Sequence, residues 1–430
     1  MRTLTQTIAM TVATVIMAIS AGCADDMNSG ELARTVVHVT VDMPELPAGA
    51  DVVDRIYTFR NVSSDKTTQY APASDIELIP GLYDASFSAR VLVPGAAETT
   101  LRANLTSINI AGAETEVVLK AYNNRETDDL IIAEVFFAGT LQSSGNQYYG
   151  DDYVKLYNNT DHVIYADGLT LFESKFSTTQ KFNYSPDIMG EAMTVQALYT
   201  VPGTGKDVPV QPGEYLLLAD TGIDHRVANP NSFDLSHADF EWYDISTKPN
   251  DLDIDSPVEN LDKWYCYTLS YWMLHNRGFH TWGIARIPVD RDTYLKDYWY
   301  SYDYDQVTIA GTFPMTQSAY RLPNEWIVDA VTTSVAAQYV WQICDPSIDC
   351  GWTSCGTIDH DKTRFFHSIR RKLLYVTDDG RAVFKDTNNS TDDFNAMCVP
   401  SEIELQRTAT DIDGTPCIQL TYDGVTSMPR

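Results

Sequence analysis

Apolar and polar residues alternate along most of this chain, and this period-two pattern predicts β-strands rather than helices. In the first third, strand-like stretches lie at 35–44, 55–62, 75–93 and 105–122, each bounded by Pro, Gly, Ser or Asp. No helical periodicity interrupts them. Short strands at such regular spacing predict a β-sandwich domain over residues 34–122.

A second β pattern follows a polar segment without apolar periodicity at 123–129, which we interpret as a linker. The pattern begins with an almost continuous apolar run at 131–139, typical of a strand buried on both faces. Later strand-like stretches lie between long insertions rich in Asp, Asn, Tyr and Trp, at 153–157, 162–172, 214–219, 283–287, 325–331, 368–376 and 418–424. Residues 130–430 are therefore predicted to form a second β-sandwich, which makes the fold class all-β with two sandwich domains.

The polar residues of the stretch DDYVKLYNNTDHVIYADGLTLFE, residues 151–173, stand in a definite order. Asn158, Asn159 and Asp161 interrupt the alternation, where their side chains can close an Asx turn. Asp167-Gly168 then supplies a glycine that tolerates positive φ. We interpret these residues as scaffold rather than as a site.

Three phrases of the second domain resemble the lamin-tail family, an immunoglobulin-like β-sandwich: IIAEVFFAG (131–139), DDYVKLYNNTDHVIYADGLTL (151–171) and VQPGEYLLLAD (210–220). WIVDAV (326–331) and SIRR (368–371) look like later strands of that family. The resemblance places the family's characteristic positions at Glu134, Tyr157, Asn158, Asp167, Gly168, Pro212, Gly213 and Glu214. In the first domain, IPGLY (79–83) resembles a prealbumin-like or carboxypeptidase-regulatory-like module.

Further phrases resemble a family of uncharacterised Bacteroidetes surface lipoproteins built on this domain. They are ADTGIDH (219–225), FDLSHADFEWYD (233–244) and KDTNNSTDDF (385–394). This resemblance covers essentially the whole mature chain and implies no established activity. An immunoglobulin-like fold does not itself specify a function.

The N-terminus has the pattern of a lipoprotein signal peptide at residues 1–22, followed by a polar tether at 23–33. Arg2 precedes an apolar run from Ile8 to Ile19, which is too short to span a bilayer. The sequence Ser20-Ala21-Gly22-Cys23 resembles a lipobox, although Ser20 replaces the usual Leu, and it makes Cys23 the expected lipidation site. Asp25-Asp26 resembles the surface-export signal of Bacteroidetes lipoproteins. The expected location is the outer membrane, lipid-anchored and facing outward.

The charge and the cysteines limit the possible partners and the structure. The formal net charge of −29 opposes binding to nucleic acid. An even number of cysteines in an exported chain predicts disulfides rather than zinc, because the spacings lack the Cys-x2-Cys pattern. The candidates after Cys23 are Cys266, Cys344, Cys350, Cys355, Cys398 and Cys417. We predict at least two bridges, one of which joins Cys266 to the cluster at 344–355, with Cys398 and Cys417 as another candidate pair.

Metal-binding and catalytic patterns are weak. Asp251, Asp253 and Asp255 have the spacing of the first calcium-loop ligands, but Ser256 stands where the loop needs glycine, so a solvated acidic loop is favoured. The histidines show no metal-ligand spacing, and neither a G-x-S-x-G motif nor a phosphate-binding loop occurs. We expect no cofactor and no enzymatic activity.

Dense aromatic segments at 263–282 and 294–306 lie in predicted insertions, where binding loops are common. Tyr and Trp beside Asp can stack on sugar rings and hydrogen-bond their hydroxyls, or these rings can form a secondary core. The candidate ligand-binding residues are Trp264, Tyr271, Trp272, Trp282, Tyr298, Trp299, Tyr302 and Tyr304.

The leading function from the sequence is a non-catalytic binding or accessory module of the outer membrane. By analogy with similar lipoproteins, it would capture a nutrient, with a glycan as one ligand class, together with a TonB-dependent transporter. The alternatives are a glycan-acting hydrolase and a structural envelope or adhesion protein.

Overall fold

The computed structural model describes residues 34–407 except 45, 65, 73–74, 95–98, 125–127 and 251. Within them the chain forms two compact units, which divide between Tyr122 and Asn123. The signal peptide, the tether, Cys23, Asp25-Asp26, Asp251, Cys417 and the strand expected at 418–424 lie outside the described residues.

The first unit is a sandwich of a three-stranded and a five-stranded sheet, in the orders β4-β1-β7 and β3-β2-β5-β6-β8. β1 and β7 pair in parallel, and the pairs β1–β4, β2–β3, β2–β5 and β5–β6 are antiparallel. Alternate residues of β5, from Tyr83 to Val91, are buried in the core between the sheets. The strands are β1 (Thr35–Asp42), β2 (Asp51–Asn61), β3 (Thr67–Tyr70), β4 (Asp75–Leu78), β5 (Gly81–Leu92), β6 (Thr99–Ile110), β7 (Glu114–Lys120) and β8 (Tyr122–Asn124).

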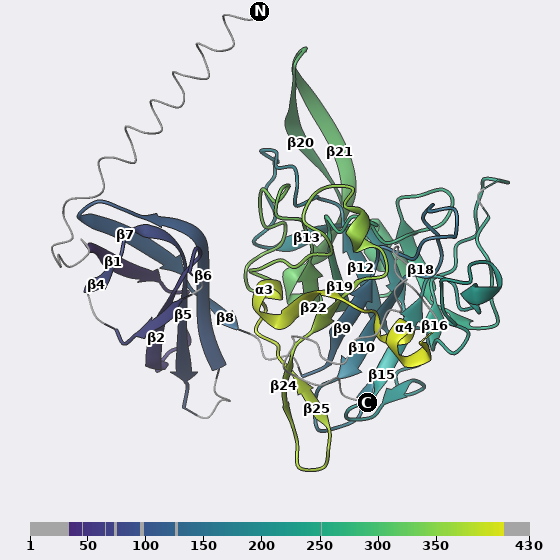
Figure 1. Cartoon of the computed structure of the whole chain (residues 1–430), viewed down its shortest axis with the longest axis horizontal. Coiled ribbons are helices and arrows are strands. Elements are labelled where there is room, and N and C mark those ends of the chain that lie inside the picture. Colours follow the sequence, from purple (N-terminus) through teal and green to yellow (C-terminus); the bar gives the residue numbers. More distant parts are fainter. Residues whose placement is uncertain are drawn as a thin grey trace, which may run out of the picture. The chain divides into compact units, whose positions relative to one another are not determined.

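The second unit contains two seven-stranded sheets (Figure 1). One has the order β17-β16-β15-β10-β9-β23-β26. Its strands are β17 (Glu259–Asn260), β16 (Phe240–Glu241), β15 (Tyr215–Ala219), β10 (Tyr153–Asn158), β9 (Leu130–Phe136), β23 (Ser368–Arg371) and β26 (Phe394–Cys398).

The other sheet has the order β20-β21-β13-β12-β19-β22, and β18 pairs with β13 beside this path. Its strands are β20 (Trp299–Thr308), β21 (Gly311–Pro323), β13 (Ala192–Thr200), β12 (Leu169–Ser174), β19 (Thr281–Arg286), β22 (Ile327–Thr332) and β18 (Asp262–Cys266).

Short elements complete the second unit. The two-stranded ribbons are β11 (Ile164–Tyr165) with β14 (Pro209–Val210), and β24 (Leu373–Val376) with β25 (Ala382–Phe384). The helices are α2 (Arg291–Asp297), α3 (Ser390–Asp393) and α4 (Ser401–Gln406), with 3-10 turns η1 (His225–Val227), η2 (Asn324–Trp326) and η3 (Lys362–Arg364). The sequence patterns did not predict these helices, which are too short to show a helical period.

The central strands of the second unit are buried along their whole length. Every residue of β9, β10, β12 and β13 is buried. This confirms the expectation from the apolar run at 131–139. One face of each sheet contributes to the core between the sheets, and the long insertions cover the outer faces with further apolar clusters. The insertions are thus part of the folded domain.

The turns of the stretch 151–173 confirm its interpretation as scaffold. Asn158 Oδ1 accepts hydrogen bonds from Thr160 N at 3.0 Å and Thr160 Oγ1 at 2.7 Å, which is an Asx turn. Gly168 has φ +73°, and the Asp167 carboxylate accepts from three main-chain amides of residues 205–208. These polar groups hold loops in place.

Candidate functional site

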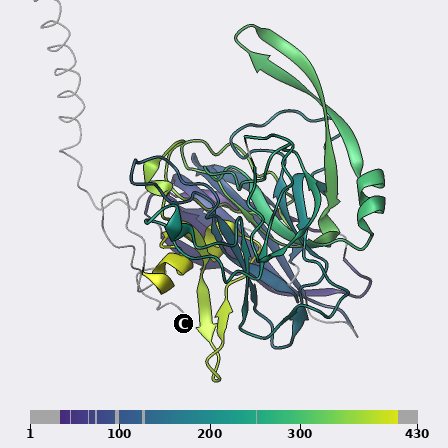
Figure 2. The same cartoon turned by 90° about the vertical axis from the view of Figure 1, so that its right-hand side faces the viewer.

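The long hairpin of β20 and β21 projects beyond the sandwich of the second unit (Figures 1 and 2). A third extended segment adds to its edge at the base, because the main chains of Ser185 and Asp303 exchange two hydrogen bonds of 2.9 Å. Since side chains alternate across a β-ribbon, these three segments present one polar and one aromatic face.

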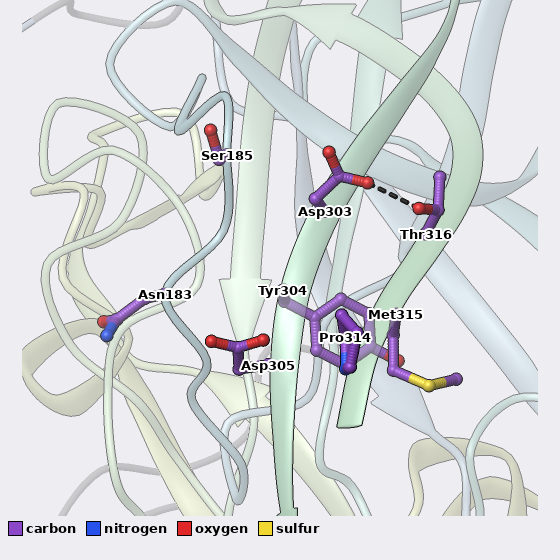
Figure 3. A pocket seen from close by; sticks show the side chains of 8 residues that line it. All are labelled: Asn183, Ser185, Asp303, Tyr304, Asp305, Pro314, Met315 and Thr316. Carbon is purple, nitrogen blue, oxygen red and sulfur yellow. Dashed lines mark hydrogen bonds between the residues drawn. The ribbon is translucent and has the colours of Figure 1, made fainter. Parts of the chain in front are cut away.

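Residues from both faces of the ribbon line a cavity of about 430 Å³ (Figure 3). Asp303 and Asp305 lie two residues apart on β20, and Asn183 and Ser185 lie on the added segment. Thr316 of β21 donates a hydrogen bond of 2.6 Å to Asp303 Oδ1, which fixes that carboxylate. The cavity therefore offers several hydrogen-bonding groups within a space large enough for a small polar ligand.

The aromatic face is built from rings that stack on one another. Tyr184 lies 4.0 Å from Phe176 between ring centroids and nearly parallel to it, and Phe176 meets Tyr302 edge-on at 5.4 Å. Tyr304 lies 4.6 Å from Phe182 and also lines the cavity. Burial raises the pKa of Tyr184 and of Tyr302 above its usual range. These rings pack the base of the hairpin against the segment 176–184.

A second, smaller cavity of about 40 Å³ lies along the same cluster of rings. Trp341 and Tyr184 line it, and Lys181 Nζ stands 5.3 Å from the centroid of the Trp341 ring. The segment from Phe176 to Met189 thus contributes to both cavities. The sequence interpretation missed this segment, although the alternation of Phe182, Asn183, Tyr184 and Ser185 was a signal for it.

The eight aromatic candidates fall into three groups. Trp272 and Trp282 are fully buried between the sheets. These two rings are therefore part of the core, which was the alternative to ligand binding. Their indole nitrogens donate to the same atom, Glu173 Oε2, at 3.2 and 3.1 Å. Tyr302 and Tyr304 belong to the hairpin, and only Tyr304 borders the larger cavity.

The remaining candidates are Trp299, at the start of β20, and residues outside the hairpin. Trp264 and Tyr298 lie 5.8 and 5.1 Å from the ring of Tyr294 in α2. Trp299 packs edge-on against Tyr320 at 4.7 Å and is 46% exposed. Tyr271 lies in the loop before Trp272, and its carbonyl accepts a hydrogen bond from Thr268. The structure therefore does not bring the eight residues together into one binding face.

The acidic loop at 251–262 is held by hydrogen bonds to its own region. Asp253 accepts from the amides of Asp244 and Ile254, and Asp255 accepts from Asn260. Burial raises the pKa of Asp253 to about 6. Within the described residues, no group of three or more His, Cys, Asp or Glu is arranged to hold a metal ion.

The disulfide prediction requires a correction. No disulfide joins two cysteines among the described residues, so the predicted link from Cys266 to the 344–355 cluster is absent. Cys266 Sγ lies 3.3 Å from Thr268 Oγ1 in the turn after β18, whereas Cys344 is buried and its Sγ lies 3.4 Å from Asp349 O. The partner proposed for Cys398, Cys417, is outside the described residues.

A buried carboxylate holds the loop that was expected to need cross-links. Asp349 Oδ1 accepts from the amides of Gly351 and Ser390, and Asp349 Oδ2 accepts from Thr332 N and Ser390 Oγ. Four hydrogen bonds to one charged group satisfy it in the interior. The sequence interpretation missed this role, because Ser390 lies 41 positions further along the chain.

The two stacked sheets define the second unit as a β-sandwich, and the predicted all-β class is confirmed. Residues 211–401 match a family described as a protein of unknown function, DUF4876. A crystal structure of a DUF4876 family protein from Bacteroides thetaiotaomicron is similar with a TM-score of 0.53 and 20% identity, over 85% of this chain and 96% of that one. At this identity the likeness concerns the fold alone. It agrees with the expected resemblance to a Bacteroidetes family of unknown function.

A second structure, of a proposed cell adhesion protein from Bacteroides eggerthii, has a TM-score of 0.16 and 7% identity, over 68% of this chain and 84% of that one. This value is too low to carry an argument. No curated protein matches the chain. Among the described residues, no helix has the length and apolar character needed to cross a membrane.

Proposed function

We propose that this protein is a non-catalytic, ligand-binding lipoprotein of the outer membrane surface, and that it binds glycans at the base of the β20–β21 hairpin. The observation that carries the proposal is the cavity of about 430 Å³ between that hairpin and Asn183 and Ser185. Carboxylate, amide and hydroxyl groups beside a tyrosine ring suit a sugar, whose hydroxyls need hydrogen bonds and whose ring face is apolar.

The arrangement of the carboxylates supports binding rather than hydrolysis. Asp303 and Asp305 project from the same strand into the same cavity. Glycosidases instead place their two carboxyl groups on either side of the scissile bond. The net charge of −29 also favours neutral or basic saccharides over acidic ones.

The cell-surface part of the proposal rests on the sequence of the N-terminus. Cys23 would carry the lipid, and Asp25-Asp26 would direct export to the outer face. Docking on a TonB-dependent transporter would then deliver the captured ligand. Labelling cells with a fatty acid tests the anchor: label in the wild type and none in Cys23→Ala is expected, and label retained in that variant contradicts the anchor. Crosslinking on intact cells tests the docking, and failure to recover a transporter contradicts only that part.

Affinity electrophoresis in gels containing soluble polysaccharides tests the binding site. At least one neutral polysaccharide should retard the wild-type protein, and Tyr304→Ala and Asp305→Ala should each weaken binding roughly tenfold or more. Tyr375→Ala is the matched control, because Tyr375 is an exposed tyrosine on β24. The proposal fails if no polysaccharide retards the protein, if the two cavity variants bind like the wild type, or if the polysaccharide is cleaved.

A further inference from the structure

A pair of buried carboxylates lies at the end of the first sheet of the second unit, in a different sheet from the hairpin. Asp152 directly precedes β10 and Asp220 directly follows β15. The two residues extend the ladder of these strands by one step, since Asp220 N donates to Asp152 O at 2.9 Å. The geometry of the sheet therefore places the two side chains next to each other.

Both carboxylates are removed from water. Asp152 is 6% exposed and Asp220 is 4% exposed, and Asp220 Oδ2 is fully buried without a hydrogen-bond partner. The charged groups that act most strongly on Asp220 are acids: Asp152, Asp253, Asp151 and Asp244. Burial, followed by the repulsion of these neighbours, raises the pKa of Asp220 well above its usual range, and Asp152 shifts in the same direction.

The neighbouring buried acids are, by contrast, well satisfied. Asp151 accepts hydrogen bonds from the hydroxyls of Thr140 and Ser232, the latter at 2.7 Å, and its charge also interacts with His225. Asp244 accepts from Tyr199 Oη at 2.8 Å and from Trp272 N at 2.7 Å, and Lys263 Nζ lies 2.6 Å from its other oxygen. Asp220 thus differs from buried acids in the same region of the fold.

A buried carboxylate without a donor is strongly destabilising unless a proton or a cation neutralises it. One divalent ion can neutralise such a group together with a second buried carboxylate beside it. Oxygen ligands without cysteine or histidine suit a hard cation, and calcium tolerates irregular sites completed by main-chain oxygens and water.

Hydrogen bonds join the turn after Asp220 to the loop that carries Asp253, which supports a preformed binding site. Glu241 accepts hydrogen bonds from Gly222 N at 2.6 Å and from Ser256 N at 2.8 Å, so it links the turn after Asp220 to the loop that carries Asp253. A Cβ at Gly222 would stand 2.4 Å from Val258, so the two loops are in close contact. The turn after Asp220 and the loop of Asp253 are thus held against each other.

We propose that Asp152 and Asp220 bind one calcium ion, which neutralises the buried pair and stabilises this end of the sheet. The site differs from the loop at 251–262 whose spacing suggested calcium in the sequence, because the ligands come from two strand ends 68 positions apart (220 − 152). The role is structural and does not depend on the proposed binding of glycans.

Calcium binding is tested first on the full chain after treatment with a chelator. Equilibrium dialysis should find one bound calcium per chain, and calcium should raise the melting temperature. Asp220→Asn and Asp152→Asn should each weaken calcium binding roughly a hundredfold. Asp255→Asn is the matched control, since Asp255 is an exposed acid of the loop at 251–262.

The melting temperatures of Asp220→Asn and of the wild type, each measured in calcium and in chelator, distinguish a bound ion from a proton shared by the two carboxylates. If calcium occupies the site, Asp220→Asn melts above the wild type in chelator, because it removes an unpaired charge, and below it in calcium. Asp220→Asn melting above the wild type in both buffers would instead indicate a shared proton and overturn the proposal. Wild-type protein that binds no calcium overturns it as well, and this measurement does not depend on the folding of any variant.

Discussion

The aromatic segments at 263–282 and 294–306 resemble each other in composition, but each contains both buried and exposed residues, and one tryptophan from each illustrates the difference. Trp282 lies on β19, which is flanked by β12 and β22 in the sheet, and it is fully buried. Trp299 lies on β20 at the edge of the same sheet and is 46% exposed. The environment of an aromatic residue here therefore depends on the position of its strand in the sheet, which the local sequence does not reveal.

Replacement of a ring in the core should give the largest effect. Trp282→Ala leaves a cavity beside Phe137, whose ring centroid lies 4.9 Å away, and should lower the free energy of unfolding of the second unit by about 3–5 kcal/mol. Trp299→Ala, the matched change at the sheet edge, should cost less than about 1 kcal/mol. Urea unfolding followed by near-UV circular dichroism measures both, and similar losses in the two variants would contradict the comparison.

Replacement of Glu173, the buried acceptor for the indole nitrogens of the core, should give the next largest effect on stability. Glu173→Ala leaves the indole nitrogens of Trp272 and Trp282 and the amide of Gln196 without their acceptor, which should cost about 2–4 kcal/mol. Glu173→Gln keeps one carbonyl oxygen and should cost about 1 kcal/mol. The same urea titration compares them, and equal losses would mean that the side chain acts through its volume rather than through hydrogen bonds.

The sequence predicted strands such as β9, β10, β12 and β15 because their burial appears locally, as an alternation or as a continuous apolar run. For example, the run at 131–139 became the fully buried strand β9. The sequence interpretation missed the buried strand β13 and the β20–β21 hairpin. Contacts between distant segments were not predictable in this way. Asp349 depends on Ser390, the added strand at Ser185 depends on Asp303, and the pair Asp152 and Asp220 depends on the register of β10 and β15. The loop at 344–355 shows the same limit. Its cysteines suggested cross-links, but hydrogen bonds to the Asp349 carboxylate hold the loop instead.

Tyr302 lies on the same edge strand as Trp299 but is almost as buried as Trp282. Tyr302 is on β20 but only 2% exposed, because Phe176 and Tyr184 cover its ring at 5.4 and 5.6 Å. Tyr302→Ala should therefore cost about 2 kcal/mol, less than the change at Trp282, since a cluster near the surface can relax around the gap. Tyr302→Phe removes only the hydrogen bond from Tyr302 Oη to Gln317 and should cost about 1 kcal/mol or less. A loss for Tyr302→Ala as large as for Trp282→Ala would place the cluster within the cooperative core.

The hairpin tip should give the smallest effect on stability. Val307 and Ile309 are 74% and 110% exposed, so the fold gains little by burying them. Replacing residues 307–312 with Asn-Gly leaves Gln306 opposite Phe313 and supplies the residues that a tight two-residue turn prefers. The free energy of unfolding should change by less than about 1 kcal/mol, and glycan binding at the base should persist, because the cavity uses residues 303–305 and 314–316. A large loss of stability would show that the tip packs on the sandwich, and a loss of binding alone would extend the site along the hairpin.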